Sequence, residues 1–184
     1  MNVGIYGGSF NPVHFGHVGL AKWVMEHTDL DELWMLVSPN NPLKPAGMLA
    51  PEEERLQGVR EAVSRLELPE GKRVIASDFE FTLPRPSYTA NTLRELQKAY
   101  PGHTFTLIIG EDNLAIFNRW RESEFILANF RIFVYPRHHE ETVAPIAVPE
   151  TAKGVVYLKG APYFDVSSTQ IRQQNAGLGT KKVK

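Results

Sequence analysis

The chain alternates short apolar runs with longer stretches in which apolar residues recur at helical spacing. The short runs predict β-strands over residues 2–6, 32–37, 73–76, 104–109, 130–135 and 155–158. Several of them are apolar almost throughout, which is typical of strands covered on both sides by helices. The pattern therefore favours a parallel sheet.

The stretches between these runs predict helices. Residues 16–27 place their apolar side chains on one face, and Pro51 fits the first position of a second helix. Ser87 is expected to cap a third helix that turns Tyr100 toward the core. Further helical segments are expected before the fifth apolar run, and a last helix is expected to start at Ser167 with capping-box spacing.

Segments rich in Pro, Gly, Asn or charged residues predict loops at residues 38–50, 78–86 and 137–150. The last of these loops contains His138 and His139, to which the sequence assigns no role. Alternating strands and helices predict the α/β class, with a parallel sheet and helices on both faces. In such folds, ligands bind beyond the carboxyl ends of the strands.

The length and composition are those of one ordinary globular domain. A chain of 184 residues can bury one sizeable core, and we expect the domain to span residues 1–176 with a solvated, frayed tail over 177–184. The net charge of −1 gives no global basic field, so nucleic acid is not an expected partner. The oligomeric state is left open, a homo-oligomer included.

The chain contains no cysteine, which excludes disulfides, thiolate zinc sites and cysteine nucleophiles. This composition is compatible with a reducing compartment, and a cytoplasmic location is expected. The first residues form an apolar strand-like run without a basic segment, so no signal peptide is expected. No apolar run approaches the roughly 20 residues that cross a bilayer, so no membrane partner is expected.

The stretch GGSFNPVHFGH, residues 7–17, leaves the first predicted strand and enters the first predicted helix. Glycines permit a sharp turn and the close approach of a ligand, and the helix N-terminus favours an anion. His14 and His17 are three residues apart and can share a face, where their ring N–H groups would suit a polyphosphate. Zinc binding by the pair lacks a third ligand of clear spacing, and a role in packing or capping stays open.

The segment SSTQIR, residues 167–172, opens the last predicted helix. Hydroxyl groups and unpaired backbone N–H groups at a helix start bind phosphate, and Arg172 adds a forked cation. The same residues could also form an ordinary helix cap.

Both segments resemble the signatures of the nucleotidyltransferase superfamily, which combines a glycine turn, Phe, Asp or Asn, Pro and His-x-Gly-His with a distal Ser-Ser-Thr-x-Ile/Val-Arg. Between them, RPSYTANTL at residues 85–93 is similar to the Ser-Tyr-Thr-x-Asp-Thr-Leu segment of bacterial nicotinate-mononucleotide adenylyltransferases. GEDNL at residues 110–114, followed by Trp120, is similar to that family's Gly-x-Asp-x-Leu and Trp block. The resemblance covers nearly the whole chain.

The resemblance implies a single Rossmann-like domain that transfers AMP from ATP to nicotinate mononucleotide. It implies catalytic roles for His14 and His17. The ATP-binding residues would be Gly8, Ser9, Phe10, His14, His17, Gly110, Asp112, Ser167, Ser168, Thr169 and Arg172. The mononucleotide-binding residues would be Lys44, Tyr88, Thr89 and Trp120. Mg²⁺ would accompany ATP and be held mainly by phosphates rather than by protein ligands.

Each of these residues also has a plainer interpretation from the sequence alone. Trp120 could stack on a pyridinium ring or could be a core aromatic, and Tyr88 could simply pack. Asp112 could be no more than a helix cap, and Lys44 could be a solvated loop residue. The order and context of the motifs favour the functional roles.

Several positions depart from the bacterial pattern. Asn91 stands where the family usually has Asp, and Ser9 and Asn11 replace the commoner Thr and Asp. The Gly-Ser-Phe-Asn-Pro form is similar to that of animal-type enzymes that use nicotinamide mononucleotide. An enzyme for the amide, or one of dual specificity, is therefore the alternative.

Other members of the superfamily, which act on phosphopantetheine or glycerol phosphate, share the first motif but lack the Ser-Tyr-Thr and Trp blocks. A nucleotide-sensing module without turnover is an alternative of another class. Intact His14, His17 and Arg172 argue against it.

Overall fold

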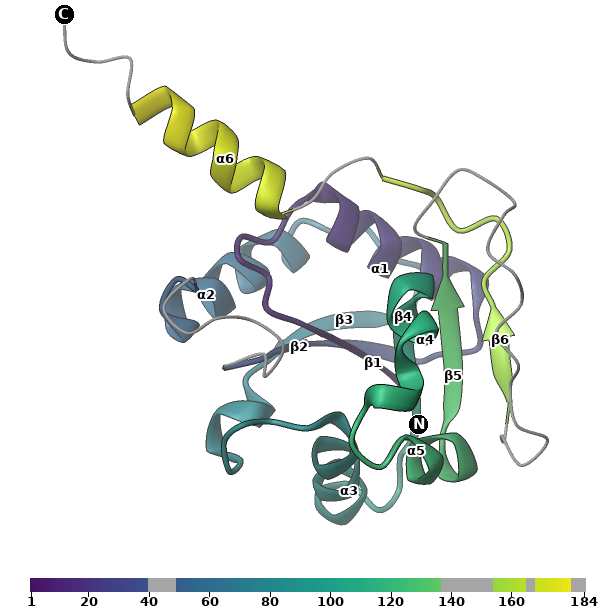
Figure 1. The fold of residues 1–184 in the computed structure, drawn as a ribbon. Helices are drawn as coiled ribbons and strands as arrows, with labels where there is room; N and C mark the ends of the chain where they lie inside the picture. Colours follow the sequence, from purple (N-terminus) through teal and green to yellow (C-terminus); the bar gives the residue numbers. More distant parts are fainter. Residues whose placement is uncertain (40–48, 137–153, 165–167, 180–184) are drawn as a thin grey trace, which may run out of the picture.

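The computed structural model describes residues 1–39, 49–136, 154–164 and 168–179. Within them, six parallel strands form one sheet in the order β3-β2-β1-β4-β5-β6 (Figure 1). The strands are β1 Asn2–Gly8, β2 Glu32–Val37, β3 Arg73–Ser77, β4 Thr104–Gly110, β5 Arg131–Tyr135 and β6 Val155–Tyr157. All six predicted strands are therefore present, and their bounds differ from the prediction by at most two residues.

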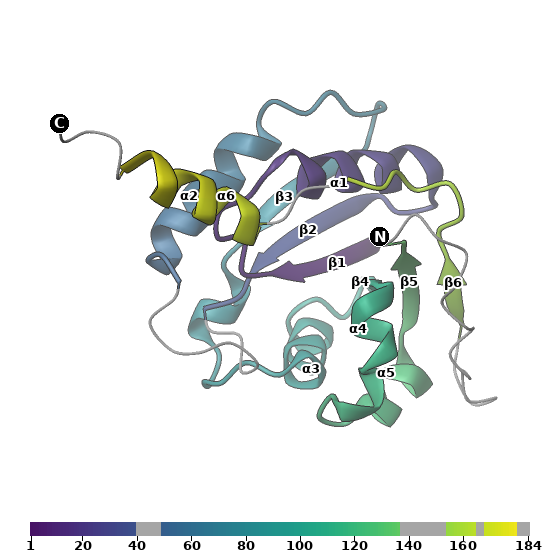
Figure 2. The ribbon, with the colours of Figure 1, turned by 45° about the horizontal axis from the view of Figure 1, so that its top comes forward.

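Helices cover both faces of the sheet, as predicted. One face packs against α1 (Phe15–His27) and α2 (Glu52–Val63), and the other against α3 (Thr89–Ala99), α4 (Glu111–Ala115) and α5 (Ser123–Asn129). Figure 2 shows α1 and α3 on opposite sides of β1. The central strands therefore lie between two apolar clusters, which explains their almost uninterrupted apolar sequences.

The alternation of β1 divides its side chains between the two cores. Val3 and Ile5 pack in the cluster beneath α3, whereas Tyr6 packs in the cluster beneath α1. Val3 is completely buried and Ile5 is 2% exposed. β1 is thus fixed in position on both faces, and so is the loop that follows it.

Gly7 and Gly8, which were predicted to form a turn after the first strand, are instead the last two residues of β1. β1 continues through Gly7 and Gly8, and the left-handed residue of the following turn is Phe10, with φ 42°. A Cβ atom on Gly8 would lie 3.0 Å from the Phe10 ring. A side chain at position 8 would therefore press on the buried Phe10 ring, which folds back against the strand.

The third helix begins and ends differently from the prediction. α3 starts at Thr89, and the extended backbone of Tyr88 occupies the cap position without a side-chain cap bond, so Ser87 is not the cap. The helix ends at Ala99, and Tyr100 just beyond it is 38% exposed, with its ring edge-on against buried Trp34 at 5.0 Å between centroids. Pro51 likewise precedes α2 as its cap residue instead of opening the helix.

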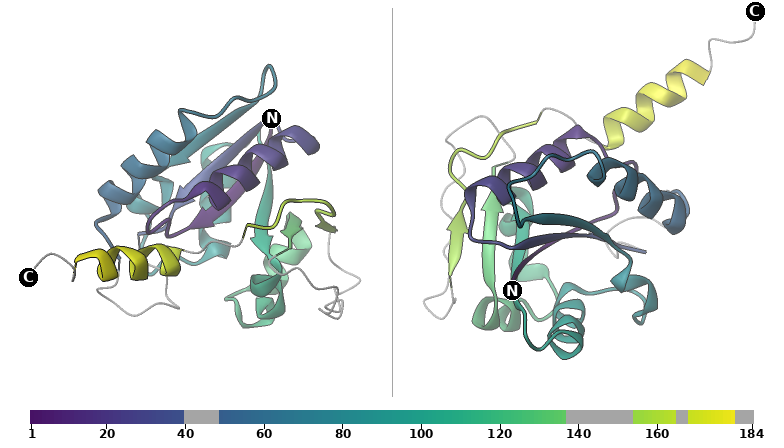
Figure 3. Two further views of the ribbon diagram at one scale, coloured as in Figure 1. Left: turned by 90° about the horizontal axis from the view of Figure 1, so that it is seen from above. Right: turned by 180° about the vertical axis from the view of Figure 1, so that it is seen from behind.

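Short helical turns occupy parts of two connections. The predicted loop over 78–86 contains the 3₁₀ helix η1 (Phe79–Thr82), and η2 (Phe117–Arg119) follows α4. The last helix, α6 (Ser168–Gly179), continues to Gly179 and so extends into the segment expected as a tail. In Figure 3, α6 points away from the sheet in both views. No helix among the described residues is long and apolar enough to cross a membrane.

Candidate active site

A cavity of about 710 Å³ opens beyond the carboxyl ends of β1 and β4. These two strands are neighbours at the point where the order of the sheet reverses, which is where parallel α/β sheets bind ligands. Its wall includes eleven residues predicted from the sequence: Gly8, Ser9, Phe10, His14, His17, Tyr88, Thr89, Gly110, Asp112, Trp120 and Ser168. Motifs from both halves of the chain therefore meet at one site.

His14 and His17 stand together at the start of α1. Their ring centroids are 3.7 Å apart, with an angle of 30° between the planes. The backbone N–H of His14 donates to Nδ1 of His17 over 3.2 Å. Because Nδ1 accepts a hydrogen bond, the His17 ring carries its hydrogen on Nε2, where it is a donor. The His17 ring also packs edge-on against Phe10, with centroids 5.0 Å apart.

A buried arginine, which the sequence did not predict, binds the loop that follows β1 (the first loop). Arg55 of α2 is 4% exposed and donates to four backbone carbonyls. The acceptors are Ser9 O at 2.7 Å, Ser38 O at 2.8 Å, Ala50 O at 2.9 Å and Pro39 O at 3.2 Å. One guanidinium therefore joins the loop after β1, the end of β2 and the approach to α2.

The N-terminus of α6 touches the same first loop from the other side. Ser168 Oγ donates to the Pro12 carbonyl over 2.8 Å, and the Arg172 guanidinium donates to the Asn11 carbonyl and, at 3.0 Å, to Thr169 Oγ1. Ser168 lines the cavity, whereas Thr169 and Arg172, also predicted to bind ATP, are not among its lining residues. The two signature segments are thus neighbours, although more than 150 residues separate Pro12 from Ser168 in the chain.

The opposite part of the cavity is aromatic and basic. Trp120 follows η2, and Tyr88 and Thr89 stand at the start of α3. Arg121 places its guanidinium 4.9 Å from the centre of the Tyr88 ring. Trp120, Arg119 and Arg121 all line the cavity, and the two arginines were not among the residues predicted from sequence.

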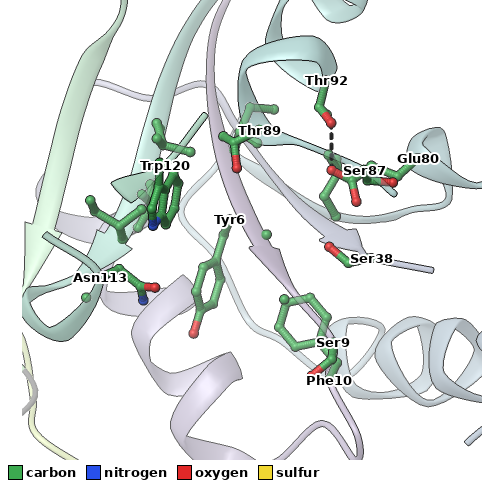
Figure 4. A pocket seen from close by; sticks show the side chains of 18 of the residues that line it. Tyr6, Ser9, Phe10, Ser38, Glu80, Ser87, Thr89, Thr92, Asn113 and Trp120 are labelled. Carbon is green, nitrogen blue, oxygen red and sulfur yellow. Dashed lines mark hydrogen bonds between the residues drawn. The ribbon is translucent and has the colours of Figure 1, made fainter. Parts of the chain in front are cut away.

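Glu80 is a further residue that the sequence did not predict. It lies in η1, is 7% exposed and accepts a 2.7 Å hydrogen bond from Thr92 Oγ1 at Oε1. Burial raises the pKa of its carboxyl group, and the hydroxyls of Thr92 and Ser38 oppose that rise in part. Figure 4 shows Glu80 and Trp120 on opposite sides of the Tyr6 ring. An acid in a predicted loop that ends in two prolines carries no sequence signal of such burial.

Buried polar atoms without partners mark this cavity as a ligand site. Within the described part of the chain, Glu80 Oε2, Ser87 Oγ and Trp120 Nε1 are buried and have no hydrogen-bond partner. All three residues line the cavity. Since buried polar groups in folded proteins are nearly always paired, a polar ligand is the natural partner for these atoms.

Asp112, which is predicted to bind ATP, also lines the cavity. Gly110 ends β4, and Asp112 lies in the first turn of α4 with its side chain exposed. Asn113 beside it lines the cavity too. Asn91, the departure from the family pattern, is exposed on α3 outside the cavity wall, where its Oδ1 accepts a 3.4 Å hydrogen bond from Arg94.

Lys44 and Ser167 fall outside the described residues, so their roles stay predictions. His138 and His139, to which the sequence assigns no role, also lie outside them. Among the residues that the structure describes, no three His, Cys, Asp or Glu side chains gather in a way that could hold a metal ion.

The sheet order and the cavity at its reversal point define a Rossmann-like nucleotide-binding domain. A family model described as cytidylyltransferase-like matches residues 5–174. The chain therefore belongs to the cytidylyltransferase-like family.

Several curated proteins are close to the chain over most of its length. A probable nicotinate-nucleotide adenylyltransferase of Bacteroides thetaiotaomicron is 47% identical over 173 residues, which are 94% of this chain and 81% of that protein. One of Flavobacterium johnsoniae is 42% identical over 172 residues, which are 94% of this chain and 85% of that protein. Nicotinic acid mononucleotide adenylyltransferase of Plasmodium falciparum, solved in complex with NaAD, has a similar fold with a TM-score of 0.76. It is 17% identical, and the match covers 94% of this chain and 82% of that one.

Proposed function

We propose that this chain is a nicotinate-nucleotide adenylyltransferase, which transfers AMP from ATP to nicotinate mononucleotide and releases pyrophosphate. The observation that carries the proposal is one cavity with two unlike ends. One end has two imidazoles at a helix start, and the other has an indole, a phenol ring and two guanidinium groups. A phosphate chain suits the first end and a flat pyridine ring the second. The names of the curated relatives agree with this assignment.

The reaction needs no general base in the protein. A phosphate monoester is largely dianionic at neutral pH, with a second pKa of about 6, and is itself the nucleophile. An oxygen of the mononucleotide phosphate attacks the α-phosphorus of ATP and forms the new P–O bond. The bond from the α-phosphorus to the oxygen that bridges it to the β-phosphorus breaks, and its electron pair leaves with pyrophosphate. The product is deamido-NAD.

Catalysis then consists of alignment and of stabilising charge at the transferred group. The Nε2–H of His17 is a preset donor because the backbone of His14 already occupies Nδ1. His14 lies against it, and Ser168 and Arg172 reach the same loop from α6. We assign these four groups to the triphosphate. Asp112 is assigned to the ATP ribose, and Trp120, Tyr88, Thr89 and Lys44 to the mononucleotide.

Mg²⁺ is proposed to enter as part of the MgATP complex. When bound, it would neutralise the leaving phosphates, which would hold it together with its own waters rather than protein ligands. The cytoplasmic location stays a prediction.

The test of the proposed function offers ATP and Mg²⁺ with nicotinate mononucleotide or with nicotinamide mononucleotide, and measures pyrophosphate and the dinucleotide product. We expect pyrophosphate and the dinucleotide to form together, and to form much faster with nicotinate mononucleotide than with nicotinamide mononucleotide. Equal rates would assign dual specificity. Binding of ATP without pyrophosphate release from either mononucleotide would assign the chain to the class of nucleotide-sensing modules and overturn the proposal.

A further inference from the structure

Two arginines flank Trp120 at the mononucleotide end of the cavity. Arg119 ends η2 and Arg121 follows the indole, and both side chains line the cavity together with Trp120. Both residues are exposed, so their charges are hydrated and available to a ligand. Neither lies near the imidazoles of the first loop in sequence, and the proposed phosphate chemistry gives them no role.

The guanidinium group of Arg121 is held in place by an aromatic ring. It lies 4.9 Å from the centre of the Tyr88 ring, a distance typical of a cation–π contact. Tyr88 precedes α3 and lines the same cavity. The cation is therefore held beside the surface on which a pyridine ring is proposed to rest.

The acid nearest to Arg121 in sequence is already engaged. Glu122 accepts two hydrogen bonds from Arg94, at 2.9 Å and 2.5 Å, in a forked arrangement. The pKa of the Glu122 carboxyl is lowered first by the hydrogen bond from Arg94 and last by the charge of Arg121. Arg94 thus occupies the carboxylate that would otherwise pair with Arg121.

The acids within the described cavity wall do little to cancel these charges. They are Glu80 and Asp112. Glu80 is buried and hydrogen-bonded to Thr92, so Asp112, in the first turn of α4, is the exposed acid of this wall, against two exposed arginines. The mononucleotide end is therefore locally basic, although the whole chain carries a net charge of −1.

We propose that Arg119 and Arg121 select the mononucleotide whose pyridine ring carries a carboxylate over the one that carries a carboxamide. This inference rests on the proposed function and names residues that determine its specificity. The two substrates differ by one negative charge at the ring substituent, and only the carboxylate gains the charge-assisted contact with a guanidinium. The mononucleotide with the carboxamide can still stack on the indole and bind through its phosphate. It is therefore expected to bind more weakly than the one with the carboxylate, not to be excluded.

The test compares Arg121→Gln, Arg119→Gln and the double variant with wild type by kcat/KM for each mononucleotide. Each single change is expected to lower the ratio of acid to amide by about three- to tenfold, chiefly by lowering kcat/KM for the acid. Arg121→Lys should retain part of the preference because it keeps the charge and loses the fork. Raising the salt concentration should shrink the wild-type ratio, since both arginines are exposed.

Arg65→Gln is the matched control, because it removes one exposed positive charge outside the cavity wall. It should leave the ratio unchanged. Thermal unfolding of every variant shows whether the fold is intact. An unchanged ratio in the double variant would overturn the inference, as would an equal loss with both mononucleotides, which would assign the arginines a purely structural role. Failure of the proposed function looks different, because wild type would then release no pyrophosphate with either mononucleotide.

Discussion

At the scale of single residues, the pair of imidazoles at the start of α1 is the most informative contact. Two rings with centroids 3.7 Å apart can both face one ligand group. The backbone N–H of His14 occupies Nδ1 of His17, so the His17 ring needs no tautomer change before Nε2 donates to a phosphate. Such preset donors stabilise developing charge without reorganisation, which is the main source of rate in phosphoryl-type transfers.

Replacing His17 by Ala is expected to lower kcat by about 10²–10³-fold, because one preset donor to the transition state is lost. The KM for ATP should rise much less, since other groups still bind the triphosphate. Steady-state kinetics with ATP varied measures both. His27→Ala is the control, because His27 is exposed at the far end of α1 and stacks on Trp23. Near-normal turnover in the His17 variant would contradict the assigned role.

Glu80 makes a prediction about stability and pH. Its pKa in the folded protein is raised above the ordinary value of 4.5, so above that pH the native state binds more protons than the unfolded state. Its contribution to the free energy of unfolding is complete below the unfolded pKa and declines as the pH rises through the folded pKa. Glu80→Gln removes this decline, so the variant should gain stability relative to wild type as the pH increases from about 4.5.

Urea unfolding of wild type and Glu80→Gln at a series of pH values measures this difference. Glu70→Gln, at an exposed turn residue, is the control and should follow wild type at every pH. A stability difference that stays constant with pH, or that moves in the opposite direction, would show that burial does not raise the pKa of Glu80.

At the scale of elements, the cavity depends on loops that are fastened to one another rather than on any single helix. Arg55 of α2 joins the first loop to the end of β2, and α6 reaches the same loop through Ser168 and Arg172. The first loop must also keep Phe10 in a left-handed conformation, which its surroundings have to stabilise. A substitution of Arg55 should therefore weaken ATP binding although Arg55 itself is not assigned to the ligand.

Arg55→Lys is expected to lower the free energy of unfolding by about 2–5 kcal/mol, because an ammonium cannot reach four carbonyls that a planar guanidinium satisfies. The KM for ATP should rise as the loop at Ser9 loses its anchor. Denaturant unfolding and steady-state kinetics measure the two effects. Arg60→Lys on the same helix is the matched control, since Arg60 makes an exposed 3.6 Å ion pair with Asp78 and should contribute little. Equal stability of the two variants would contradict the anchoring role.

The elements that could be predicted from sequence are those with strong local signals. Apolar runs located every strand of the sheet, and the two nucleotidyltransferase signatures located two distant segments that meet beside one cavity. The remainder depends on tertiary contacts that leave no local trace. Gly7 and Gly8 continue β1 because they pair with Leu36 and Val37 of β2, and Ser87 is no cap because the backbone enters α3 at Tyr88.

The functional residues that the sequence did not predict are mainly charged, because their roles also depend on tertiary contacts. Arg55 and Glu80 look like surface residues in the sequence, and both are more than nine-tenths buried in the structure. The guanidinium of Arg121 contacts the ring of Tyr88, a residue more than thirty positions earlier in the chain, and this contact cannot be predicted from the residues around Arg121. The pattern of apolar and polar residues along the chain does not predict which residue a long charged side chain will contact in the fold.

At the scale of the whole molecule, sheet order brings the parts of the site together. β1 and β4 are neighbours, and the connections that leave them diverge to opposite faces of the sheet, toward α1 and toward α4. This divergence opens the cavity between the loops. The imidazoles enter from one side and the Trp120 segment from the other, so two substrates can meet end to end between them.

The central claim is that the His14 and His17 imidazoles and the Arg172 guanidinium converge on one triphosphate. The most direct measurement is a crystal structure with Mg²⁺ and a non-hydrolysable ATP analogue. We predict triphosphate oxygens within about 2.7–3.2 Å of His17 Nε2 and of the Arg172 guanidinium, with the adenosine near Asp112 and the far end of the cavity open beside Trp120. A triphosphate bound elsewhere, or imidazoles and guanidinium turned away from it, would contradict the account.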